Sequence, residues 1–271
     1  MKSGLLLAAL ATGLLLAGNG SAHAKKCGND SSGFSAWVAE YRKEAAAAGI
    51  NQRTLDAALG NVAYATKTIA YDRNQKSFKL SYEQFLQKRG ASTIISRGRS
   101  LKKQNADLFR RIEARFGVPA GPLLAIWGME TGFGGFTGDI PVFGPLATLS
   151  YDCRRSEFFE EQLTAALKIL QSGQLSLGQM KGAAHGEIGQ MQFLPANYLK
   201  YGADGDGNGK VDMVSSRADA LASTANYLKA YGWKAGAGYQ PGEPNFKAIQ
   251  GWNKAGVYQK AIAYIGQQID K

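Results

Sequence analysis

The spacing of apolar residues along the chain predicts a mainly helical protein. In segment 156–172 the apolar residues recur every three or four positions: Phe159, Leu163, Ala166, Leu167 and Leu170. This spacing is typical of a helix with one buried face. The same reasoning predicts further helices at 34–48, 51–59, 81–88, 94–116, 218–231 and 245–271. Strand signals are weak, with at most a short hairpin around 140–143, so we expect a mainly α fold with a long, loop-rich centre.

Residues that commonly start and stop helices support several of these boundaries. Gly49 is a natural end for the first helix, and Asn51 is a suitable N-cap for the second. The run Phe116-Gly117-Val118-Pro119 ends the helix predicted at 94–116. Pro119 and Pro122 then begin the next helix, which is apolar throughout as far as Trp127.

This apolar helix ends on a single carboxylate, Glu130, and the turn that follows contains Gly132, Gly134 and Gly135. A carboxyl group that faces apolar walls has its charged form desolvated, which raises its pKa. A carboxylic acid that stays protonated near neutral pH can serve as a general acid. The glycines leave space for a bulky substrate beside it. The alternative is that Glu130 is simply the last residue of a helix.

Residues 1–24 have the pattern of a secretory signal peptide. A single positive charge precedes a short apolar run, and Ala22-His23-Ala24 forms a small-residue cleavage site. We therefore expect residues 25–271 to form an exported, periplasmic protein, with an uncleaved N-terminal anchor as the alternative. Two lysines precede Cys27 in place of the small apolar residues of a lipoprotein box, so no lipid anchor is expected.

The chain is strongly basic, with a formal net charge of +11 at pH 7. Its lysines and arginines are scattered and form no block. A basic exported protein favours polyanionic partners such as anionic envelope surfaces. The sequence has no zinc-finger, winged-helix or single-strand-binding signature, so nucleic acid is not an expected partner. The alternative is that the charge serves solubility alone.

Cys27 and Cys153 are the only two cysteines in the chain. Export favours oxidising conditions, so we predict a disulfide between them. Two free thiols are the alternative, because the sequence does not give the distance between the side chains.

The segment 182–195 alternates glycines with polar residues and ends in Phe193-Leu194-Pro195. Glycines let a backbone approach a ligand closely, and Gln190 and Gln192 each offer both a donor and an acceptor. Sugar hydroxyl and amide groups need such paired hydrogen bonding. The alternative is a tight connection between helices whose glutamines cap helix ends.

A second loop, from Asp204 to Asp212, has the composition of a cation-binding loop. Oxygen-bearing side chains stand at its first, third and fifth positions, followed by glycine: Asp204, Asp206 and Asn208. With the Lys210 carbonyl, this pattern suits a hard cation such as calcium. The twelfth position is Ser215, which is not the bidentate Glu of an EF-hand. The alternative is an Asp/Gly turn without metal.

Taken together, Glu130 and the glycine-glutamine loop resemble the lytic murein transglycosylase B family of bacterial cell walls. Further ordered motifs extend this resemblance from about residue 34 to the C-terminus: Phe116-Gly117-Val118-Pro119, 146–150, 154–159, 192–195 and 225–233. The resemblance implies a lysozyme-like catalytic core at about 105–271, with additional N-terminal helices at about 34–104 and an EF-hand-like loop.

The resemblance also implies a reaction. Family members cleave the β-1,4 bond between N-acetylmuramic acid and N-acetylglucosamine and close a 1,6-anhydro ring, using one carboxyl group as acid and then as base. No cofactor is needed for this chemistry, and calcium is expected to be structural. The expected partners are peptidoglycan glycan strands and other cell-wall enzymes, with the protein itself a monomer.

The resemblance matches individual residues of this chain to site residues of the family. Glu130 matches the acid/base, and Gln192 matches a glutamine that lines the sugar site. Tyr227 matches an active-site tyrosine, while Asn253 and Tyr258 match an asparagine and a tyrosine that close over the cleft. In the cation loop, the family's last acid falls on Asp219, with Asp212 as a direct or water-mediated ligand.

Two positions depart from the family pattern. Ala183 stands where the family commonly has a serine hydroxyl close to the catalytic carboxylate. Glu187 is an unexpected carboxylate beside the site, and it either faces solvent or raises the pKa of Glu130 by like-charge coupling. Our hypothesis is that Glu187 tunes activity without replacing Glu130.

Two other functions remain open on the sequence. A muramidase of the same fold would complete the reaction with water. A non-catalytic cell-wall-binding protein would keep the fold, and the absent hydroxyl at Ala183 leaves room for it. The intact Glu130 motif favours the transglycosylase.

Overall fold

The computed structural model describes residues 27–74 and 80–271. These residues form thirteen α-helices: α1 Phe34–Ala47, α2 Gln52–Leu59, α3 Thr66–Arg73, α4 Tyr82–Lys88, α5 Ala91–Gln104, α6 Ala106–Phe116, α7 Ala120–Thr131, α8 Phe143–Tyr151, α9 Ser156–Gln171, α10 Pro195–Tyr201, α11 Arg217–Ala230, α12 Phe246–Trp252 and α13 Gly256–Asp270. A 3-10 turn, η1 (Leu177–Gln179), and two very short strands, β1 (Ile140–Pro141) and β2 (Lys181–Gly182), complete the described part. The predicted signal peptide at 1–24 lies outside the described residues.

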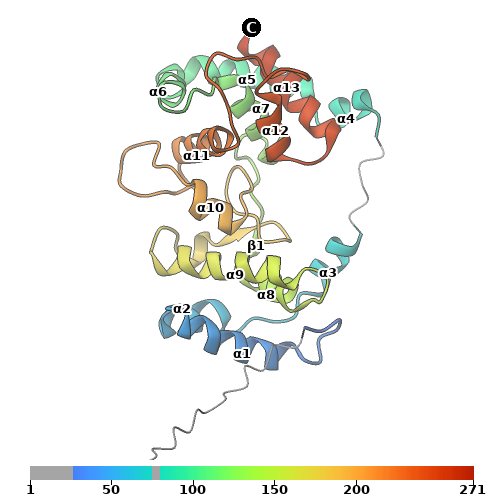
Figure 1. Ribbon diagram of the computed structural model, residues 1–271, viewed down its shortest axis with the longest axis vertical. Coiled ribbons are helices and arrows are strands. Elements are labelled where there is room, and N and C mark those ends of the chain that lie inside the picture. Colours follow the sequence, from blue (N-terminus) through green and yellow to red (C-terminus); the bar gives the residue numbers. More distant parts are fainter. Residues whose placement is uncertain (1–26, 75–79) are drawn as a thin grey trace, which may run out of the picture.

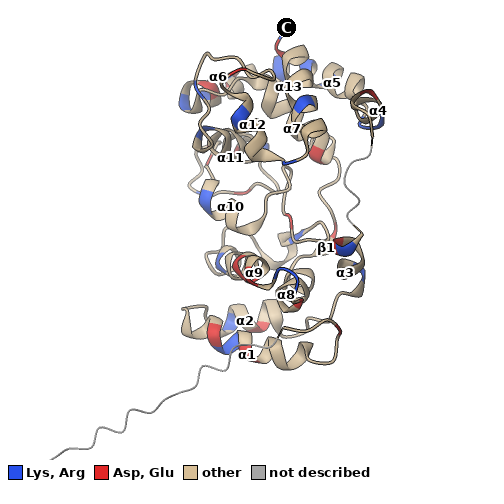
Figure 2. Ribbon diagram, turned by 45° about the vertical axis from the view of Figure 1, so that its right-hand side comes forward, with Lys and Arg blue, Asp and Glu red and all other residues tan. Residues whose placement is uncertain are grey.

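The helices form two groups along the long axis of an elongated molecule (Figure 1). Helices α1, α2, α3, α8 and α9 pack together at one end. Helices α4 to α7 and α11 to α13 pack together at the other, and α10 contacts both α9 and α11 between them. Basic and acidic residues are scattered over both groups (Figure 2). No helix in the described part of the chain is long and apolar enough to cross a membrane.

The predicted boundary near residue 105 does not follow this spatial grouping. Helix α5 packs on α7 and α13, although it precedes the boundary. Helices α8 and α9 pack with α1 and α2, although they follow it. The division into an N-terminal helical portion at about 34–104 and a lysozyme-like core at about 105–271 therefore stays a prediction.

Helix α7 is the centre of the second group, and it is buried on almost every side. A helix that is apolar all round is stable only when other elements cover it. Helix α13 packs along it so closely that a Cβ added at Gly121 would lie 2.3 Å from the carbonyl oxygen of Gly266. This close approach is possible because both positions are glycine.

Several predicted helix limits are confirmed. The Asn51 side chain accepts a hydrogen bond from the Thr54 backbone at 2.8 Å and so caps α2. Ser81 and Gln84 form a reciprocal capping box at the start of α4. The amphipathic segment predicted at 156–172 is α9.

Two predicted helices are each broken in two. The helix expected at 94–116 is interrupted at Asn105, whose side chain donates to the Leu101 carbonyl at 2.9 Å. The helix expected at 245–271 is interrupted at 253–255, where the Asn253 side chain accepts from the Ala255 backbone at 2.9 Å. Asparagine side chains that bond nearby backbone compete with the helical pattern in this way.

The expected hairpin around 140–143 is wrong. Strand β1 pairs antiparallel with β2, which lies about forty residues later, and Ile140 is opposite Gly182. Phe143 begins helix α8 instead. The two-stranded ladder ties the turn after α7 to the start of the glycine-glutamine loop.

A disulfide joins Cys27 to Cys153, with 5.0 Å between the two Cα atoms. Beside it, the Gly28 backbone donates to the Tyr151 carbonyl at 2.9 Å. The Tyr151 hydroxyl accepts from the Gly33 backbone at 3.2 Å. The start of the described chain is thus fastened to the connection between α8 and α9.

Candidate active site

Glu130 stands at the end of α7 and lines a cavity of about 430 Å³. The other lining residues come from the glycine-glutamine loop, α10, α11 and the end of α12: Ala183, Glu187, Gln192, Phe193, Leu194, Asn197, Tyr227, Trp252 and Asn253. Segments far apart in the sequence therefore meet around one carboxyl group.

Two donors hold the same oxygen of Glu130. The Tyr258 hydroxyl donates to Oε1 at 2.8 Å, and the Trp252 indole N–H donates to it at 3.1 Å. While Tyr258 and Trp252 donate to Oε1, neither can accept a hydrogen bond from a proton on that same oxygen. When the carboxyl group is neutral, Oε1 is therefore its carbonyl oxygen and the proton belongs on Oε2.

Burial raises the pKa of Glu130 above the ordinary carboxyl range, because desolvation penalises the charged form. Hydrogen bonds from Trp252 and Tyr258 and the positive charge of Arg89 oppose this rise, while the negative charge of Glu187 adds to it. Burial is the strongest of these effects. The site therefore favours the protonated form of Glu130 more than water does, and the anion accepts hydrogen bonds from two donors.

Tyr258 does not line the cavity, although we predicted that it closes over the cleft. It is buried behind Glu130 on α13 and packs against Phe85. Burial and the neighbouring Glu130 raise the pKa of Tyr258 well above its ordinary range. The phenol therefore stays protonated and acts as a donor to the carboxyl group.

Gln192 lines the cavity with a left-handed backbone, at φ 53°. Its side-chain amide donates to the carbonyls of Thr137 and Gly189, both at 2.9 Å. Both amide hydrogens are thus used, and Oε1 is the atom left to accept from a ligand. The prediction that Gln192 offers a donor as well is wrong. A non-glycine residue in this region is strained, which is common at binding sites.

Gln190 lies behind the wall of the cavity and is not among the residues that line it. Its side-chain amide donates to the Val214 carbonyl at 3.0 Å, and its own carbonyl accepts from the Thr131 hydroxyl at 2.7 Å. These contacts tie the end of α7 to the loop. In this structure Gln190 supports the site instead of facing a ligand.

Tyr227 and Asn253 line the cavity as predicted by position. The Tyr227 hydroxyl donates to the Gly251 carbonyl at 2.8 Å, and its ring stacks on Tyr231. The Asn253 side chain caps the turn before α13. Tyr227 therefore presents mainly a ring surface, because its hydroxyl already has an acceptor.

Sequence reasoning missed Trp252 and Arg89 as partners of Glu130. Trp252 adjoins the predicted Asn253, but nothing in the sequence indicates that its N–H turns toward α7. The Arg89 guanidinium lies over the Tyr258 ring, 5.6 Å from its centroid, and donates to the Met129 carbonyl at 3.4 Å. The predicted residues Ala183 and Glu187 both line the cavity.

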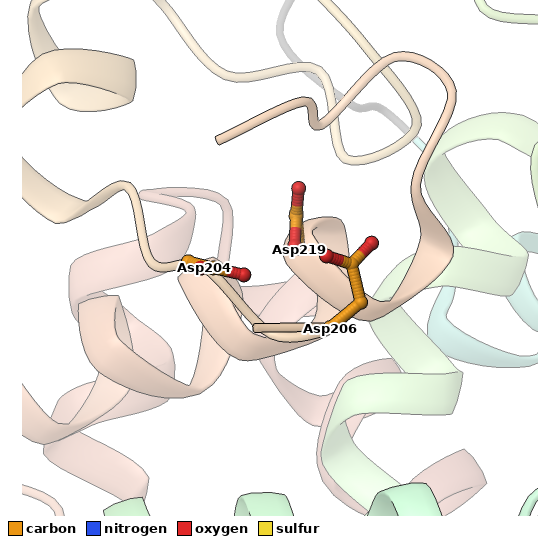
Figure 3. Close-up of side chains that lie close together, drawn as sticks. All are labelled: Asp204, Asp206 and Asp219. Atoms are coloured by element: carbon orange, nitrogen blue, oxygen red, sulfur yellow. The ribbon is translucent and has the colours of Figure 1, made fainter. Parts of the chain in front are cut away.

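Two carboxylates of the second loop, Asp204 and Asp206, converge with Asp219 of α11 (Figure 3). One ligand oxygen from each of Asp204, Asp206 and Asp219 lies within 4.8 Å of the others. Asp219 comes from the first turn of α11 and is fully buried, so desolvation raises its pKa. Its oxygens accept from the backbones of Gly205 and Asp212 at 2.8 and 2.7 Å.

Asp212 turns away from this cluster. Its Oδ1 accepts from the backbones of Val214 and Ser215, and its Oδ2 accepts from the Gln179 amide at 2.9 Å. Asn208 uses its side-chain oxygen to accept from the Lys210 backbone at 2.8 Å. The direct-ligand prediction for Asp212 therefore disagrees with the geometry, while Asn208 and the Lys210 carbonyl stay predictions.

A larger apolar groove of about 990 Å³ lies between α2, α3 and the β1–α8 segment. Its lining includes Tyr64, Tyr71 and Phe143, and its charged members are Lys67 and Lys181. It holds no carboxyl group, thiol or imidazole among its described lining residues. The carboxyl groups Glu130 and Glu187 line the smaller cavity instead.

A family model described as a transglycosylase SLT domain matches residues 33–242. The chain belongs to the SLT-domain transglycosylase family. The resemblance that the sequence motifs indicate is thereby confirmed. The chain is also 35% identical over 150 residues to membrane-bound lytic murein transglycosylase B of Escherichia coli K12, a match that covers 52% of this chain and 41% of that protein.

Solved structures confirm the mainly α, lysozyme-like fold of this SLT-domain transglycosylase. SltB3 of Pseudomonas aeruginosa, in complex with NAG-NAM-pentapeptide, matches with a TM-score of 0.82 and 30% identity over 88% of this chain and 79% of that one. SltB3 has also been solved with NAG-anhNAM-pentapeptide. The Escherichia coli lytic transglycosylase Slt35 in complex with calcium matches with a TM-score of 0.77 and 23% identity, over 86% and 92% of the two chains.

Proposed function

We propose that the protein is a peptidoglycan lytic transglycosylase in which Glu130 is the only acid and base. The observation that carries the proposal is a half-buried carboxyl group, at the wall of a cavity, whose Oε1 accepts from two donors and whose pKa is raised by desolvation. Membership of the SLT-domain family supports it.

In the proposed reaction the Glu130 proton on Oε2 passes to the oxygen of the β-1,4 bond between N-acetylmuramic acid and N-acetylglucosamine. The bond from the muramyl C1 to that oxygen breaks, and N-acetylglucosamine leaves with the proton. The Glu130 carboxylate then takes the proton of the muramyl O6 hydroxyl as O6 bonds to C1. The ring closes as a 1,6-anhydro sugar, no water is consumed, and Glu130 is again neutral.

The residues around Glu130 take distinct roles in this reaction. Tyr258 and Trp252 stabilise the carboxylate that exists between the two proton transfers. We assign sugar contacts to Gln192, Tyr227 and Asn253, and Gln190 to support of the loop. The complexes of SltB3 with NAG-NAM-pentapeptide and NAG-anhNAM-pentapeptide support a muramyl substrate and an anhydro product.

Mass spectrometry of murein sacculi digested with the purified protein tests the proposal. The expected products are muropeptides with 1,6-anhydro-muramyl ends. Products with reducing ends would instead identify the muramidase of the same fold, and intact sacculi with bound protein would identify a non-catalytic wall-binding protein.

Tyr258→Phe is expected to shift the pH profile upward. The hydroxyl lowers the pKa of Glu130 by stabilising its anion, so its loss raises that pKa further and keeps the acid protonated to higher pH. The alkaline limb of kcat/KM against pH should move to higher pH, and kcat should fall by about 10- to 100-fold because one donor to the anion is lost. An alkaline limb that moved to lower pH would contradict this role. Tyr264→Phe, an exposed tyrosine on the same helix, is the control.

We further propose that calcium binds the loop at 204–219. The donor set fits, because carboxylate oxygens from Asp204, Asp206 and Asp219 converge and hard cations prefer such ligands. The calcium complex of Slt35 supports the choice of ion. With Asn208 and the Lys210 carbonyl completing the shell, the ion would fasten the loop to the first turn of α11 and take no part in the chemistry.

Calcium is therefore expected to raise the melting temperature of chelator-treated protein. At a free concentration of one hundred times Kd, binding to the folded state alone stabilises it by about 2.7 kcal/mol. Calorimetry should show both the heat of binding and the thermal shift, and Asp206→Asn should abolish both. Asp107→Asn, an exposed acid on α6, is the matched control. Titration without heat or thermal shift would remove the calcium site.

For its location, we propose export to the periplasm through the signal peptide at 1–24. Membership of a cell-wall enzyme family and the disulfide between Cys27 and Cys153 support this proposal. The basic surface would then face anionic envelope components. Fractionation of cells that express the chain should recover it in the periplasm, shortened by the signal peptide.

A further inference from the structure

An ion-pair cluster around the buried carboxylate of Asp72 connects helix α3 to the glycine-glutamine loop. The Asp72 side chain on α3 is only 3% exposed and pairs with the guanidinium groups of Arg154 and Arg155, from the connection between α8 and α9. Arg154 also donates to the Asp72 carbonyl at 3.0 Å. On its other side, Asp72 Oδ1 lies 3.7 Å from Nε2 of His185. The cluster therefore places an imidazole ring in the loop that lines the cavity.

The same histidine faces Glu187. Its Nδ1 lies 3.8 Å from Glu187 Oε1, and its backbone N–H donates to Glu187 Oε2 at 3.2 Å. His185 thus lies near both oxygens of the Glu187 carboxylate, and Asp72 lies on the opposite side of its ring. Cys153, Arg154 and Arg155 are consecutive, so the disulfide fixes the base of the cluster.

Glu187 and Glu130 are the only charged residues among those that line the cavity in the described part of the chain. The negative charge of Glu187 disfavours the anion of Glu130, in addition to the larger effect of burial. Such coupling depends on how far the second charge is compensated by its own neighbours. His185 is such a neighbour of Glu187.

We propose that His185 is a positioning residue that shields the Glu187 carboxylate, so that helix α3 acts on the protonation of Glu130 through Asp72, His185 and Glu187. The role in turnover rests on the proposed function of Glu130, whereas the electrostatic connection does not. Glu187 is one of the two positions at which the chain departs from the family pattern.

In the described part of the chain, charged groups from several elements face this path. His185 is faced by Asp72 from α3 and by Glu187 from its own loop, and Arg154 and Arg155 compete with it for Asp72. Beyond them, Arg73 pairs with the buried Asp152. Around Glu130 the cation is Arg89, from the end of α4.

The proposal predicts opposite effects for two substitutions. Glu187→Gln removes the charge and should lower the pH at which Glu130 ionises. His185→Phe removes the ring but keeps the backbone N–H, so Glu187 acts without its shield and Glu130 should ionise at higher pH. In the Glu187→Gln background, His185→Phe should have no further effect, because the charge that it shields is gone.

The measurement is a carbon-13 NMR titration of the Glu130 carboxyl group in protein labelled at glutamate Cδ, assigned by the signal lost in Glu130→Gln. It requires no turnover. On the alkaline side of the kcat/KM profile the same variants should differ from wild type by about two- to tenfold, in the matching directions, since one pH unit is a factor of ten. Glu113→Gln, an exposed acid on α6, controls for the change in net charge.

The inference is overturned if His185→Phe leaves the Glu130 titration unchanged or lowers it, or if it shifts the titration equally with and without Glu187. His185→Leu, which also removes both ring nitrogens, gives the same comparison if the phenylalanine variant does not fold. If the Glu130 titration shifts as expected but murein gives reducing-end products, the inference about His185 is retained and the transglycosylase proposal is rejected. If murein gives anhydro products but the Glu130 titration does not shift, the transglycosylase proposal is retained and the inference about His185 is rejected.

Discussion

Replacing Glu130 with glutamine is expected to reduce murein cleavage by about three to four orders of magnitude, because the site then has no group that can give and retake a proton. The amide has nearly the same shape and can still accept from Tyr258 and Trp252 through its oxygen. Binding of glycan strands should therefore remain close to that of wild type. Release of anhydro-muropeptides measures turnover, and co-sedimentation with sacculi measures binding.

The stability of the same variant provides a second test. Because burial raises the pKa of Glu130 in the folded protein, the wild type loses stability as pH rises from the ordinary carboxyl range through the raised pKa. The glutamine variant does not ionise, so it should lose less stability over this window and be at least as stable as wild type at pH 8. Glu113→Gln should retain the wild-type pH dependence and full turnover. Substantial cleavage by Glu130→Gln would show that another group, Glu187 first, supplies the proton.

The double substitution Cys27→Ser with Cys153→Ser is expected to destabilise the protein by about 3 to 5 kcal/mol, because it frees a long loop in the unfolded chain. The bond closes a sequence separation of 126 residues and therefore restricts much of the unfolded chain. At this chain length, the melting temperature should fall by about 10 °C. Differential scanning calorimetry measures the change.

Reduction of the wild type supplies the matched comparison, since it breaks the bond without changing the sequence. Reduced wild type and the double variant should melt together, and a thiol assay should confirm that reduction is complete. If fully reduced protein melts with the oxidised form, the bond contributes little to stability. Without the disulfide, we expect the contacts of Gly28 and Gly33 with Tyr151 to open first, because they adjoin the bond.

The parts of the fold that the sequence predicts are those in which local signals agree with the final structure. Helix α9 has a regular apolar face, and Asn51 and Ser81 cap the helices that follow them. Helix α8 has no such face, because nearly all of its residues are buried, and the hairpin expected around 140–143 overlaps only its first residue. The breaks at Asn105 and Asn253 depend on side-chain hydrogen bonds that residue spacing does not reveal.

The residues of the candidate site could likewise be predicted only in part. Glu130 could be predicted because the feature that raises its pKa, an apolar helix, adjoins it in the sequence. Its donors Trp252 and Tyr258 are 122 and 128 residues away, so their orientation depends on the packing of α12 and α13. Gln190 and Gln192 look equivalent in the sequence, but the left-handed backbone at Gln192 directs one into the cavity wall while the other supports it.

The glycine contact between α7 and α13 has a consequence for how the acid is held. Gly121 meets Gly266 at one end of this antiparallel pair, and Glu130 meets Tyr258 at the other. Eight residues of helix, about 12 Å, separate Gly266 from Tyr258. Sliding α13 along α7 by even a fraction of a turn would carry the phenol away from the carboxyl group. The absence of side chains at Gly121 and Gly266 therefore sets the alignment of the hydrogen bond between Tyr258 and Glu130, although neither glycine contacts that bond.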